Sequence, residues 1–555
     1  MVRDFGKITI GQLVDLMAKE NTENEALVYP DLGLRYTYEQ FRQVCNRTAK
    51  GLMKLGVQRG EHIAIWATNV PEWVTTQFGS AKMGAVMVTV NTNYKIFELE
   101  YLLKQSDATT LILIKGTRNS DYVSMVYELC PELYHCKPGQ LKSERLPFLK
   151  NVILIDEERQ PGMFAWDDLM EMGREVTDGE LAARQASLNA DDAVNMQYTS
   201  GTTGFPKGVM LTHYNLIGNA CSLAECLNFT NKDRLCIPVP FFHCFGCVLG
   251  TMTCVVAGAA MVPVVVFNPV KVLEAIAKER CTAVHGVPTM FIMELEEMEK
   301  APYDTSSLRT GIMAGSPCPI EVMKKVVEKM GMREITITYG QTEASPGITM
   351  TRTDDPLELR VATVGRALTN VEVKIVDPET GREVPPGVQG ELFSRGYNTM
   401  KGYYKMPEAT AAAIDQDGWL HTGDLAVMDE NGYCKITGRL KDVIIRGGEN
   451  IYPREIEEFL YTHPQIKDVQ VVGVPSAKYG EEVMAFIQLK PGETLTADEI
   501  RNYCRDKIAR YKIPKYVEFI ESYPTTASGK IQKYKLREQV LDLLGLRDAA
   551  KIETA

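Results

Sequence analysis

The sequence predicts an α/β fold, divided near residue 440 into a large N-terminal domain of mixed sheets and helices and a small C-terminal α+β domain. Apolar, β-rich runs such as LILIKG (residues 111–116) and NVILID (151–156) alternate with helix-like stretches such as 269–280. That rhythm is typical of α/β proteins. The stretch 438–441 separates a turn-rich region from a compact set of β and α patterns, which places the boundary there.

Two of the expected strands run directly into polar loops. ITITYGQTE (residues 335–343) and VNMQYTSG (194–201) both pass from apolar residues to Gly, Ser and Thr. Because ligands of α/β proteins bind at the carboxyl ends of strands, we expect the site at these two loops.

Composition excludes several classes of function. The 555 residues are 45% hydrophobic and 24% charged, which is an ordinary globular mixture, and the net charge of −11 argues against nucleic acid as a partner. Thirteen cysteines without regular spacing fit a reducing cytoplasm. We read no targeting segment at the N-terminus and no integral membrane segment, because the most apolar run, 255–267, is shorter than the roughly 20 residues that a span needs. The sequence leaves a homo-oligomer open.

The segment YTSGTTGFPKGV (residues 198–209) has the composition of a phosphate-binding loop. Glycines let backbone N–H groups approach an oxyanion, hydroxyls add donors, and a lysine supplies positive charge. Its spacing differs from the Walker motif, since Gly208 and Val209 follow the lysine. The candidate ligands of phosphate in this loop are Thr199, Ser200, Gly201, Thr202, Thr203, Gly204 and Lys207.

This loop resembles the signature of the adenylate-forming superfamily, which contains acyl-CoA synthetases, firefly luciferases and peptide-synthetase adenylation domains. Further motifs follow in the family's order: AGSPCP from Ala314, YGQTE from Tyr339, GWLHTGD from Gly418, GRLKDVIIRGGENIYP from Gly438 and PTTASGKIQK from Pro524. The chain is most similar to medium-chain fatty-acyl-CoA synthetases, notably in PFFHCFG and IIRGGENIYP. The resemblance implies an N-terminal adenylation domain (1–438), a hinge (439–441) and a mobile C-terminal domain (442–555) that carries the catalytic lysine.

The implied reaction joins a carboxylate to the α-phosphate of ATP and then passes the acyl group to coenzyme A. Two anions meet in the first step, so the site needs cations and aimed donors. The resemblance makes Lys530 the lysine that bridges acyl carboxylate and α-phosphate. Thr342 would donate to the α-phosphate, and Glu343, which follows an apolar strand, can hold the Mg²⁺ that shields the phosphates.

The remaining nucleotide contacts are assigned from chemistry and resemblance together. Asp424 suits the paired hydroxyls of a ribose, because a carboxylate accepts two hydrogen bonds, and Arg439 can add donors beside it. By resemblance the adenine side and the neighbouring ATP contacts comprise Gly315, Ser316, Pro317, Tyr339, Gly340 and Gln341.

The resemblance also implies an acyl pocket, a coenzyme A tunnel and a hinge. The pocket would be lined by Phe242, His243, Ala314 and Gly340. His243 is assigned to the acyl site and not to general base work. Gly447 and Gly448 would line the pantetheine tunnel, where lack of a Cβ allows close approach. Lys441 would be the hinge on which the C-terminal domain turns between the two half-reactions.

Cys244 and Cys247 form a C-x-x-C pair that must be weighed as a redox or metal signal. A zinc site usually needs a second pair or histidines at ligand spacing, and the flanking FFH and VLG predict the buried start of a helix. We therefore interpret the pair as structural. No G-x-S-x-G or H-E-x-x-H motif is present.

The identity of the acid stays open between two shapes. Acetyl-CoA synthetases place at the position of Gly340 a tryptophan that closes the pocket, so glycine here favours an acid larger than propionate. A medium straight chain is the first choice, and a cyclic or aromatic acid such as cyclohexene carboxylate or benzoate fits a widened pocket about as well. Three further alternatives are an enzyme that loads a carrier protein, a luciferase-like oxidase, and a nucleotide-binding protein without catalysis.

Overall fold

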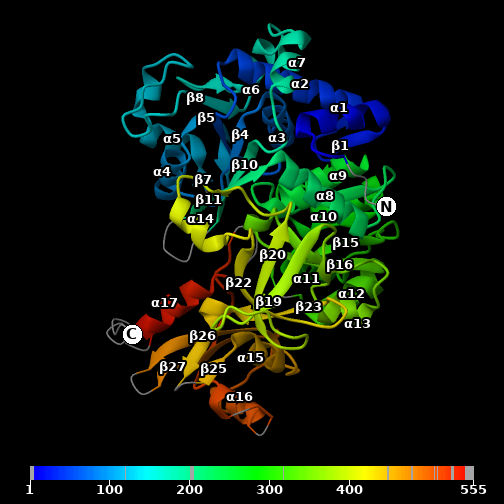
Figure 1. Cartoon of the computed structure of the whole chain (residues 1–555), viewed down its shortest axis with the longest axis vertical. Helices are drawn as coiled ribbons and strands as arrows, with labels where there is room; N and C mark the ends of the chain where they lie inside the picture. The colour runs from blue at the N-terminus through cyan, green and yellow to red at the C-terminus, as the bar shows by residue number, and fades with distance from the viewer. Residues whose placement is uncertain are drawn as a thin grey trace. The chain divides into compact units, whose positions relative to one another are not determined.

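The structure is a computed structural model that describes residues 5–118, 120–199, 206–316, 318–446, 449–476, 479–505, 507–508, 510–526 and 531–543. It separates into two compact units. Unit 1 comprises Met1–Val373 and Ser394–Leu420, and unit 2 comprises Lys374–Phe393 and His421–Ala555. Helices and strands alternate along the chain, as the sequence predicts (Figure 1). The division into residues 1–438 and 442–555 stays a prediction.

Unit 1 holds a nine-stranded sheet whose central strands are parallel. In spatial order its strands are β18 (Arg366–Ala367), β17 (Gly347–Met350), β16 (Glu334–Gly340), β15 (Thr310–Met313), β14 (Ala283–Val284), β12 (Arg234–Ile237), β13 (Ala260–Pro263), β1 (Glu25–Tyr29) and β2 (Leu34–Thr37). Helices α10 to α12 form a buried core with this sheet. The carboxyl ends of β15 and β16 lie side by side, because Met313 pairs with Ile337.

A second, eight-stranded sheet of unit 1 carries the strand that leads into the predicted phosphate loop. Its strands in order are β21 (Gly402–Tyr403), β11 (Lys207–Thr212), β10 (Ala193–Thr199), β4 (Val86–Thr89), β3 (His62–Trp66), β5 (Ala108–Ile114), β8 (Asn151–Ile155) and β9 (Phe164–Ala165). The runs LILIKG and NVILID become β5 and β8, which pair in parallel and are buried. Strands buried on both faces read as continuous apolar runs, which explains why the sequence revealed them.

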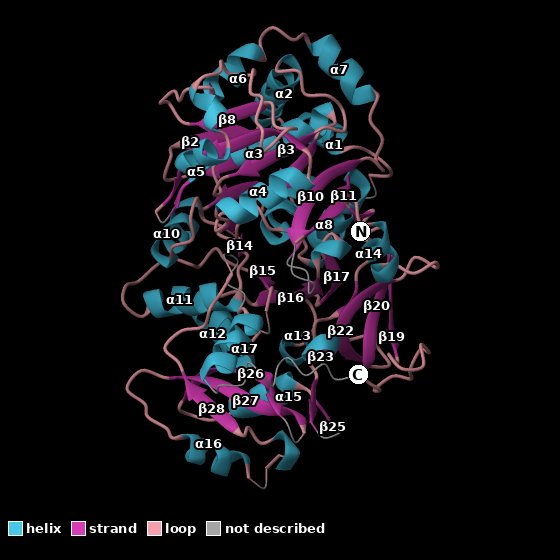
Figure 2. Cartoon of the chain, turned by 90° about the vertical axis from the view of Figure 1, so that its left-hand side faces the viewer, coloured by secondary structure: helices cyan, strands magenta, loops and turns pink. Residues whose placement is uncertain are grey.

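Helices cover both sheets, and α8 contacts β11 of one sheet and β17 of the other. Figure 2 shows the helices of unit 1 distributed between and around the strands. The helices of unit 1 are α1 (Ile10–Glu20), α2 (Tyr38–Lys54), α3 (Pro71–Met83), α4 (Ile96–Gln105), α5 (Tyr122–Leu129), α6 (Trp166–Met172), α7 (Asp178–Ala186), α8 (His213–Cys226), α9 (Thr253–Ala257), α10 (Pro269–Glu279), α11 (Pro288–Met298), α12 (Ile320–Met330), α13 (Leu357–Ala362) and α14 (Pro407–Ala413).

Helix α10 illustrates how local sequence sets these elements. The Asn268 side chain accepts from the backbone N–H of Lys271, and Pro269 occupies the first turn, where its missing N–H costs nothing. Its apolar residues, among them Leu273 and Ile276, face the core. The helix ends where Arg280 takes a left-handed conformation, so the predicted stretch 269–280 is confirmed to within one residue.

A four-stranded sheet follows, in the order β19 (Val371–Val376), β20 (Gly390–Gly396), β22 (Leu420–Met428) and β23 (Cys434–Arg439). The rest of unit 2 is a sheet of β25 (Glu449–Ile451), β24 (Ile444–Arg446), β27 (Gly480–Leu489), β26 (Ile466–Ser476) and β28 (Tyr516–Phe519), with helices α15 (Pro453–Leu460), α16 (Ala497–Cys504) and α17 (Lys533–Leu543). Two apolar clusters hold these helices on the strands, one with α15 and α16 and one with α17.

Candidate active site

Three chain segments of unit 1 meet at the carboxylate of Glu343. This residue lies in the 3₁₀ turn η3 (Thr342–Ala344), directly after β16. The Tyr403 hydroxyl, from β21, donates to Glu343 Oε1 at 2.8 Å, and the Thr199 hydroxyl, at the end of β10, donates to the same oxygen at 3.4 Å. The carboxyl ends of strands from both large sheets therefore contribute to one cluster.

The predicted phosphate loop leaves and re-enters the sheet beside this cluster. Thr199 and Lys207 are paired across β10 and β11, so they close the base of the loop. The Lys207 ammonium lies 4.8 Å from the centre of the Tyr403 ring. Ser200, Gly201, Thr202, Thr203 and Gly204 lie outside the described residues. The base of the loop thus brings a cation and a hydroxyl next to Glu343.

The polar partners of Glu343 leave its negative charge in place. Both donors, Tyr403 and Thr199, are neutral hydroxyls. Burial, reinforced by the carboxylate, raises the pKa of Tyr403, so the phenol keeps its proton and remains a donor at neutral pH. A carboxylate oriented in this way can attract a cation.

The oxygen donors around Glu343 fit Mg²⁺. No group of three or more His, Cys, Asp or Glu side chains that can hold a metal occurs among the described residues. Magnesium is usually bound by one or two carboxylates together with the phosphates of a substrate and water. Glu343 meets that requirement without a dedicated protein cage.

The segment with His243 and Cys244 contacts the site through Thr342. The Cys244 sulfur lies 3.8 Å from the Thr342 hydroxyl, and both side chains are buried. Burial raises the pKa of Cys244 to about 12 and raises that of Cys247 well above its ordinary value, so both thiols stay protonated. Both cysteines stand at the start of a buried helical segment, as the sequence predicts.

His243 Nδ1 accepts a hydrogen bond from the backbone N–H of Phe245 at 3.1 Å. This bond leaves the proton of the neutral ring on Nε2. Phe242 precedes it in the same turn, and both side chains are half-buried. Neither this hydrogen bond nor the half-buried position of the ring requires His243 to act as a base.

The segment from Ala314 lies at the end of β15. Ala314 is buried, and its backbone N–H donates to the carbonyl of Gly286 at 3.2 Å. Gly315 takes a positive φ of 88°, which favours glycine, and Ser316 follows half-buried. Pro317 lies outside the described residues. The predicted adenine-side residues that are described thus sit at the carboxyl edge of the parallel strands.

Gly340 ends β16, between Tyr339 and Gln341, and backbone packs tightly against it. A Cβ at this position would lie 1.8 Å from the carbonyl oxygen of Pro346, which is far inside contact distance. That same oxygen accepts from the backbone N–H of Gln341 at 3.0 Å. The glycine is therefore required by close backbone approach, whatever the depth of the acyl pocket. The pocket assignment of Gly340 stays a prediction.

In unit 2, Asp424 and Arg439 are paired across β22 and β23. Arg439 Nε lies 3.1 Å from Asp424 Oδ1, and Asp424 is 6% exposed. The turn before Asp424 is held by Glu391, whose Oε1 accepts from the backbone N–H of Gly423 at 2.9 Å. The Arg439 guanidinium thus balances the charge of the Asp424 carboxylate. Together the two side chains offer hydrogen-bond donors and acceptors.

Comparison with known proteins decides the family. The family model for AMP-binding enzymes matches residues 15–404, and the model for the AMP-binding enzyme C-terminal domain matches residues 455–530. The chain belongs to the AMP-binding enzyme family. The predicted fold and enzyme class, an AMP-forming acyl-CoA synthetase of the adenylate-forming superfamily, are confirmed.

Individual relatives cover nearly the full length of this AMP-binding enzyme. It is 62% identical to YngI of Bacillus subtilis (strain 168), a protein named as an acyl-CoA synthetase, over 97% of this chain and 98% of that protein. It is 44% identical to the mitochondrial medium-chain acyl-CoA ligase ACSF2 of Danio rerio, over 97% of this chain and 89% of that protein.

Solved structures of the superfamily match as well. ATP-bound MatB from Rhodopseudomonas palustris aligns with a TM-score of 0.83 at 28% identity, covering 97% of this chain and 100% of that one. The anthranilate CoA ligase AuaEII with anthranoyl-AMP aligns with a TM-score of 0.86 at 28% identity, covering 97% and 98%. These likenesses support ATP binding by this AMP-binding enzyme.

Several predicted positions of the AMP-binding enzyme are not described by the structure. Lys530, Gly447 and Gly448 lie outside the described residues. Lys441 is described, and it lies exposed in the 3₁₀ turn η4 (Leu440–Asp442) that follows β23. The catalytic lysine, the tunnel glycines and the hinge therefore stay predictions.

Two residues of the site were missed at the level of sequence. Tyr403 lies in the segment MKGYY, far along the chain from Glu343, and Glu391 lies in β20. No motif marks either residue in the sequence, where a polar side chain in a short strand also suits a surface position. The role of Tyr403 became visible once the pairing of β21 with β11 was known, and that of Glu391 once β20 was found beside β22.

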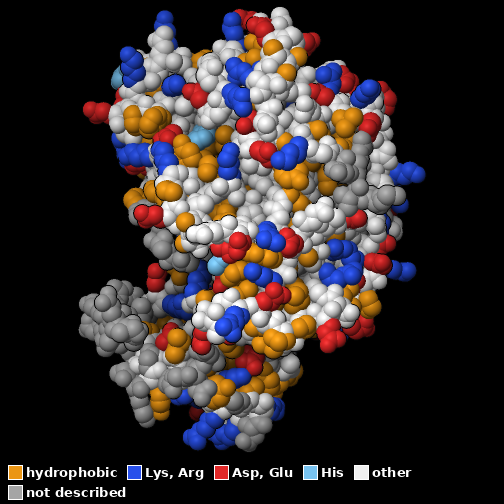
Figure 3. All heavy atoms as spheres, in the orientation of Figure 1, with side chains coloured by type: hydrophobic (Ala, Val, Ile, Leu, Met, Phe, Trp, Pro, Cys, Tyr) orange, Lys and Arg blue, Asp and Glu red, His pale blue; other side chains and the backbone are white. Residues whose placement is uncertain are grey.

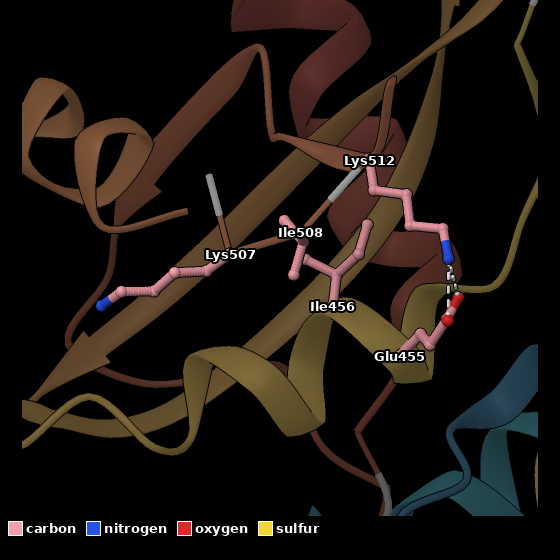
Figure 4. Close-up of a pocket in the computed structure, with 5 residues that line it drawn as sticks. All are labelled: Glu455, Ile456, Lys507, Ile508 and Lys512. Carbon is pink, nitrogen blue, oxygen red and sulfur yellow. Dashed lines mark hydrogen bonds and ion pairs between the residues drawn. The ribbon is translucent and has the colours of Figure 1, made fainter. Parts of the chain in front are cut away.

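A separate hollow of about 280 Å³ in unit 2 contains none of the predicted site residues (Figure 4). Lys512 points to Glu455 and forms an ion pair at 2.7 Å, whereas Lys507 points away from it. On the face drawn in Figure 3, acidic and basic side chains are interspersed. Among the described helices, none combines the length and the apolar character that crossing a bilayer would demand.

Proposed function

We propose that this AMP-forming acyl-CoA synthetase activates a medium-chain carboxylic acid with ATP and Mg²⁺ and transfers the acyl group to coenzyme A. The observation that carries the proposal is the Glu343 cluster, in which a carboxylate that accepts from two neutral hydroxyls stands at the base of a phosphate loop. The medium chain length is supported by the likeness to ACSF2 over nearly the whole chain.

In the first half-reaction a carboxylate oxygen of the acid attacks the α-phosphorus of ATP. The P–O bond to the β-phosphate breaks, and pyrophosphate leaves with both electrons. Lys207 and Lys530 would offset the negative charge, and Thr342 would donate to the α-phosphate. Glu343 would hold Mg²⁺, which shields the phosphates when bound.

The nucleotide would be oriented by the second polar pair. Asp424 can accept from the hydroxyls of the ribose, and Arg439 holds that carboxylate in place. Gly315, Ser316 and Tyr339 would border the adenine. Correct placement of the α-phosphate then depends on contacts at both ends of the nucleotide.

In the second half-reaction the thiol of coenzyme A attacks the acyl carbonyl, loses its proton, and displaces AMP. This step needs the region of Lys530 cleared, so we propose a rotation about Lys441 between the two steps. Replacing Lys441 with proline should leave pyrophosphate exchange intact and abolish transfer from preformed acyl-adenylate to coenzyme A. Equal survival of both half-reactions would remove Lys441 as the hinge.

The alternative substrate is a cyclic or aromatic acid. The likeness to AuaEII, which binds anthranoyl-AMP, supports it, because the two chains share their fold over almost their full length. The decisive experiment is a screen of coenzyme A-dependent AMP release over straight, branched, cyclic and aromatic acids. A maximum at octanoate or decanoate is expected, whereas a maximum at benzoate-like acids would replace the medium-chain assignment.

Two further assays, pyrophosphate exchange and oxygen consumption, separate the remaining alternatives. A carrier-loading enzyme would exchange pyrophosphate without coenzyme A turnover, and a luciferase-like oxidase would consume oxygen. A protein inert to every acid in pyrophosphate exchange would be a nucleotide-binding protein without catalysis.

A further inference from the structure

The segment Phe245–Met252 is a π-helix, and all eight of its residues are buried. It begins directly after His243 and Cys244 and continues into α9. π-Helical turns are rare and are frequently found at functional sites. The surrounding structure must therefore stabilise this one.

A ring of buried hydrogen bonds supplies that stabilisation. Gln77, from α3, donates through Nε2 to the carbonyl oxygen of Cys247 at 2.7 Å. The Thr251 hydroxyl lies 2.8 Å from Gln77 Oε1 and 2.7 Å from the same carbonyl oxygen. Because Gln77 Oε1 can only accept, the single hydroxyl proton of Thr251 goes to it, and the Cys247 carbonyl is satisfied by Gln77 Nε2. The ring joins residues 247 and 251 through the side chain of a different helix.

A second glutamine, from the eight-stranded sheet, also holds Cys247. Gln197, in β10, donates to the Cys247 sulfur at 3.2 Å. Gln77, Gln197 and Thr251 are each at most 5% exposed, so these bonds form away from water. Broken buried hydrogen bonds cost more than exposed ones, and the π-turn is therefore held firmly.

The π-helix also packs against the end of β12 with no spare room. A Cβ on Gly246 would lie 2.3 Å from the carbonyl oxygen of Pro240, and one on Gly250 would lie 3.0 Å from Ile237. At its start, Cys244 contacts Thr342, and the Phe245 ring lies 5.9 Å from that of His285. Because Pro240 and Ile237 pack closely against the π-helix, a change in the turn could not be absorbed there. It would displace Phe242 and His243 instead.

We propose that Gln77 and Thr251 are positioning residues that determine acyl specificity, by holding the Phe245–Met252 turn that sets where Phe242 and His243 stand. The inference rests on the proposed function and on the predicted acyl pocket, which Phe242 and His243 line. Neither Gln77 nor Thr251 needs to touch the acid.

The test compares selectivity and not total activity. Gln77→Met and Thr251→Val remove the ring while keeping side-chain size, and kcat/KM is measured for straight acids from butanoate to dodecanoate. The ratio of octanoate to butanoate should change about 10-fold, with KM for ATP unchanged. Thr251→Ser keeps the hydroxyl and should restore the wild-type ratio.

The matched control is Thr48→Val in α2. Thr48 is fully buried, and its hydroxyl donates to the carbonyl of Val44 at 3.1 Å, four residues earlier in an ordinary α-helix. This variant should lower thermal stability and leave the ratio unchanged. A uniform loss over all acids in Gln77→Met and Thr251→Val would overturn the inference.

Failure of the proposed function would look different. If wild-type protein takes only ring-shaped acids, the medium-chain assignment fails, and the selectivity ratio is measured between two accepted rings of different size. An unchanged ratio there would overturn the role of Gln77 and Thr251 independently. Circular dichroism checks the fold of each variant, and if one of Gln77→Met and Thr251→Val does not fold, the selectivity of the other decides the inference.

Discussion

The two polar clusters, one in each unit, differ in how their carboxylates are compensated. Glu343 in unit 1 accepts hydrogen bonds from the neutral hydroxyls of Tyr403 and Thr199, so its charge is not cancelled by them. Asp424 in unit 2 is paired with the guanidinium of Arg439 at 3.1 Å. A carboxylate whose charge is not offset, like that of Glu343, suits a cation. An ion pair without net charge, like Asp424 with Arg439, suits hydroxyl groups. The environments of the two carboxylates thus differ in the way that their predicted ligands, Mg²⁺ at Glu343 and ribose hydroxyls at Asp424, would require.

The sharpest test removes only the charge of Glu343. Glu343→Gln keeps the size and a carbonyl acceptor for Tyr403, but it loses the charge for Mg²⁺. Pyrophosphate exchange should fall about 100- to 1,000-fold, and more Mg²⁺ should be needed for half-maximal rate. Titration of Mg²⁺ against exchange rate measures both. An unchanged Mg²⁺ requirement would show that Glu343 does not serve the cation.

The second prediction breaks the neutral pair. Asp424→Asn leaves the Arg439 guanidinium without its charge partner, so KM for ATP should rise about 10- to 100-fold. Steady-state kinetics with varied ATP give this value. The control is Glu455→Gln, which removes the exposed ion pair with Lys512 in the same unit and should leave KM for ATP unchanged.

A third carboxyl, Glu294 in α11, sharpens the comparison because neither of its oxygens has a hydrogen-bond partner among the described residues. Burial raises its pKa to about 8 from an ordinary value of 4.5. Between these values the folded protein keeps a proton that the unfolded chain releases. Stability therefore falls as pH rises through this window and levels off above about pH 8.

Glu294→Gln should abolish that loss. From about pH 6 to pH 8 the wild type should lose about 2 kcal/mol more unfolding free energy than the variant, as measured by urea denaturation. Glu297→Gln, on the same helix and paired with Lys300 at 3.0 Å, is the control and should follow the wild type. Parallel pH profiles for wild type and Glu294→Gln would mean that the Glu294 carboxyl is ionised in the fold.

The smallest effect is expected at Tyr403. Tyr403→Phe removes one hydrogen bond to a charged acceptor and should lower pyrophosphate exchange about 10-fold. Tyr404→Phe removes the neighbouring hydroxyl, which donates to Asp107 at 3.0 Å, and should have no effect on exchange. Equal exchange rates in Tyr403→Phe and Tyr404→Phe would mean that Tyr403 does not orient Glu343.

Motif residues and strands were predictable because their signals are local. The run ending at Thr199 and the run ending at Gly340 are apolar strands followed by polar residues, and the structure makes them β10 and β16. Their convergence at the carboxyl edges follows from general rules for parallel sheets.

Contacts between distant segments were not predictable from one sequence. Tyr403 reaches Glu343 only because β21 pairs with β11, and Gln77 reaches Cys247 only because α3 packs beside the π-helix. Nothing in FGCVLGTM distinguishes a π-turn from an α-turn, because the preference comes from buried partners elsewhere. Pairing across the chain is set by tertiary packing, which local propensity does not encode.

The backbone carbonyl that faces Gly340 has a consequence for redesign of this enzyme. An engineer who wants a short-acid ligase would introduce a bulky side chain at residue 340, yet the oxygen of Pro346 occupies the space of its first carbon. Such a variant would have to rebuild the turn from Ser345 to Gly347 at the same time. Ala314, the other small residue predicted to line the acyl pocket, already carries a Cβ and offers a starting point that leaves the backbone in place.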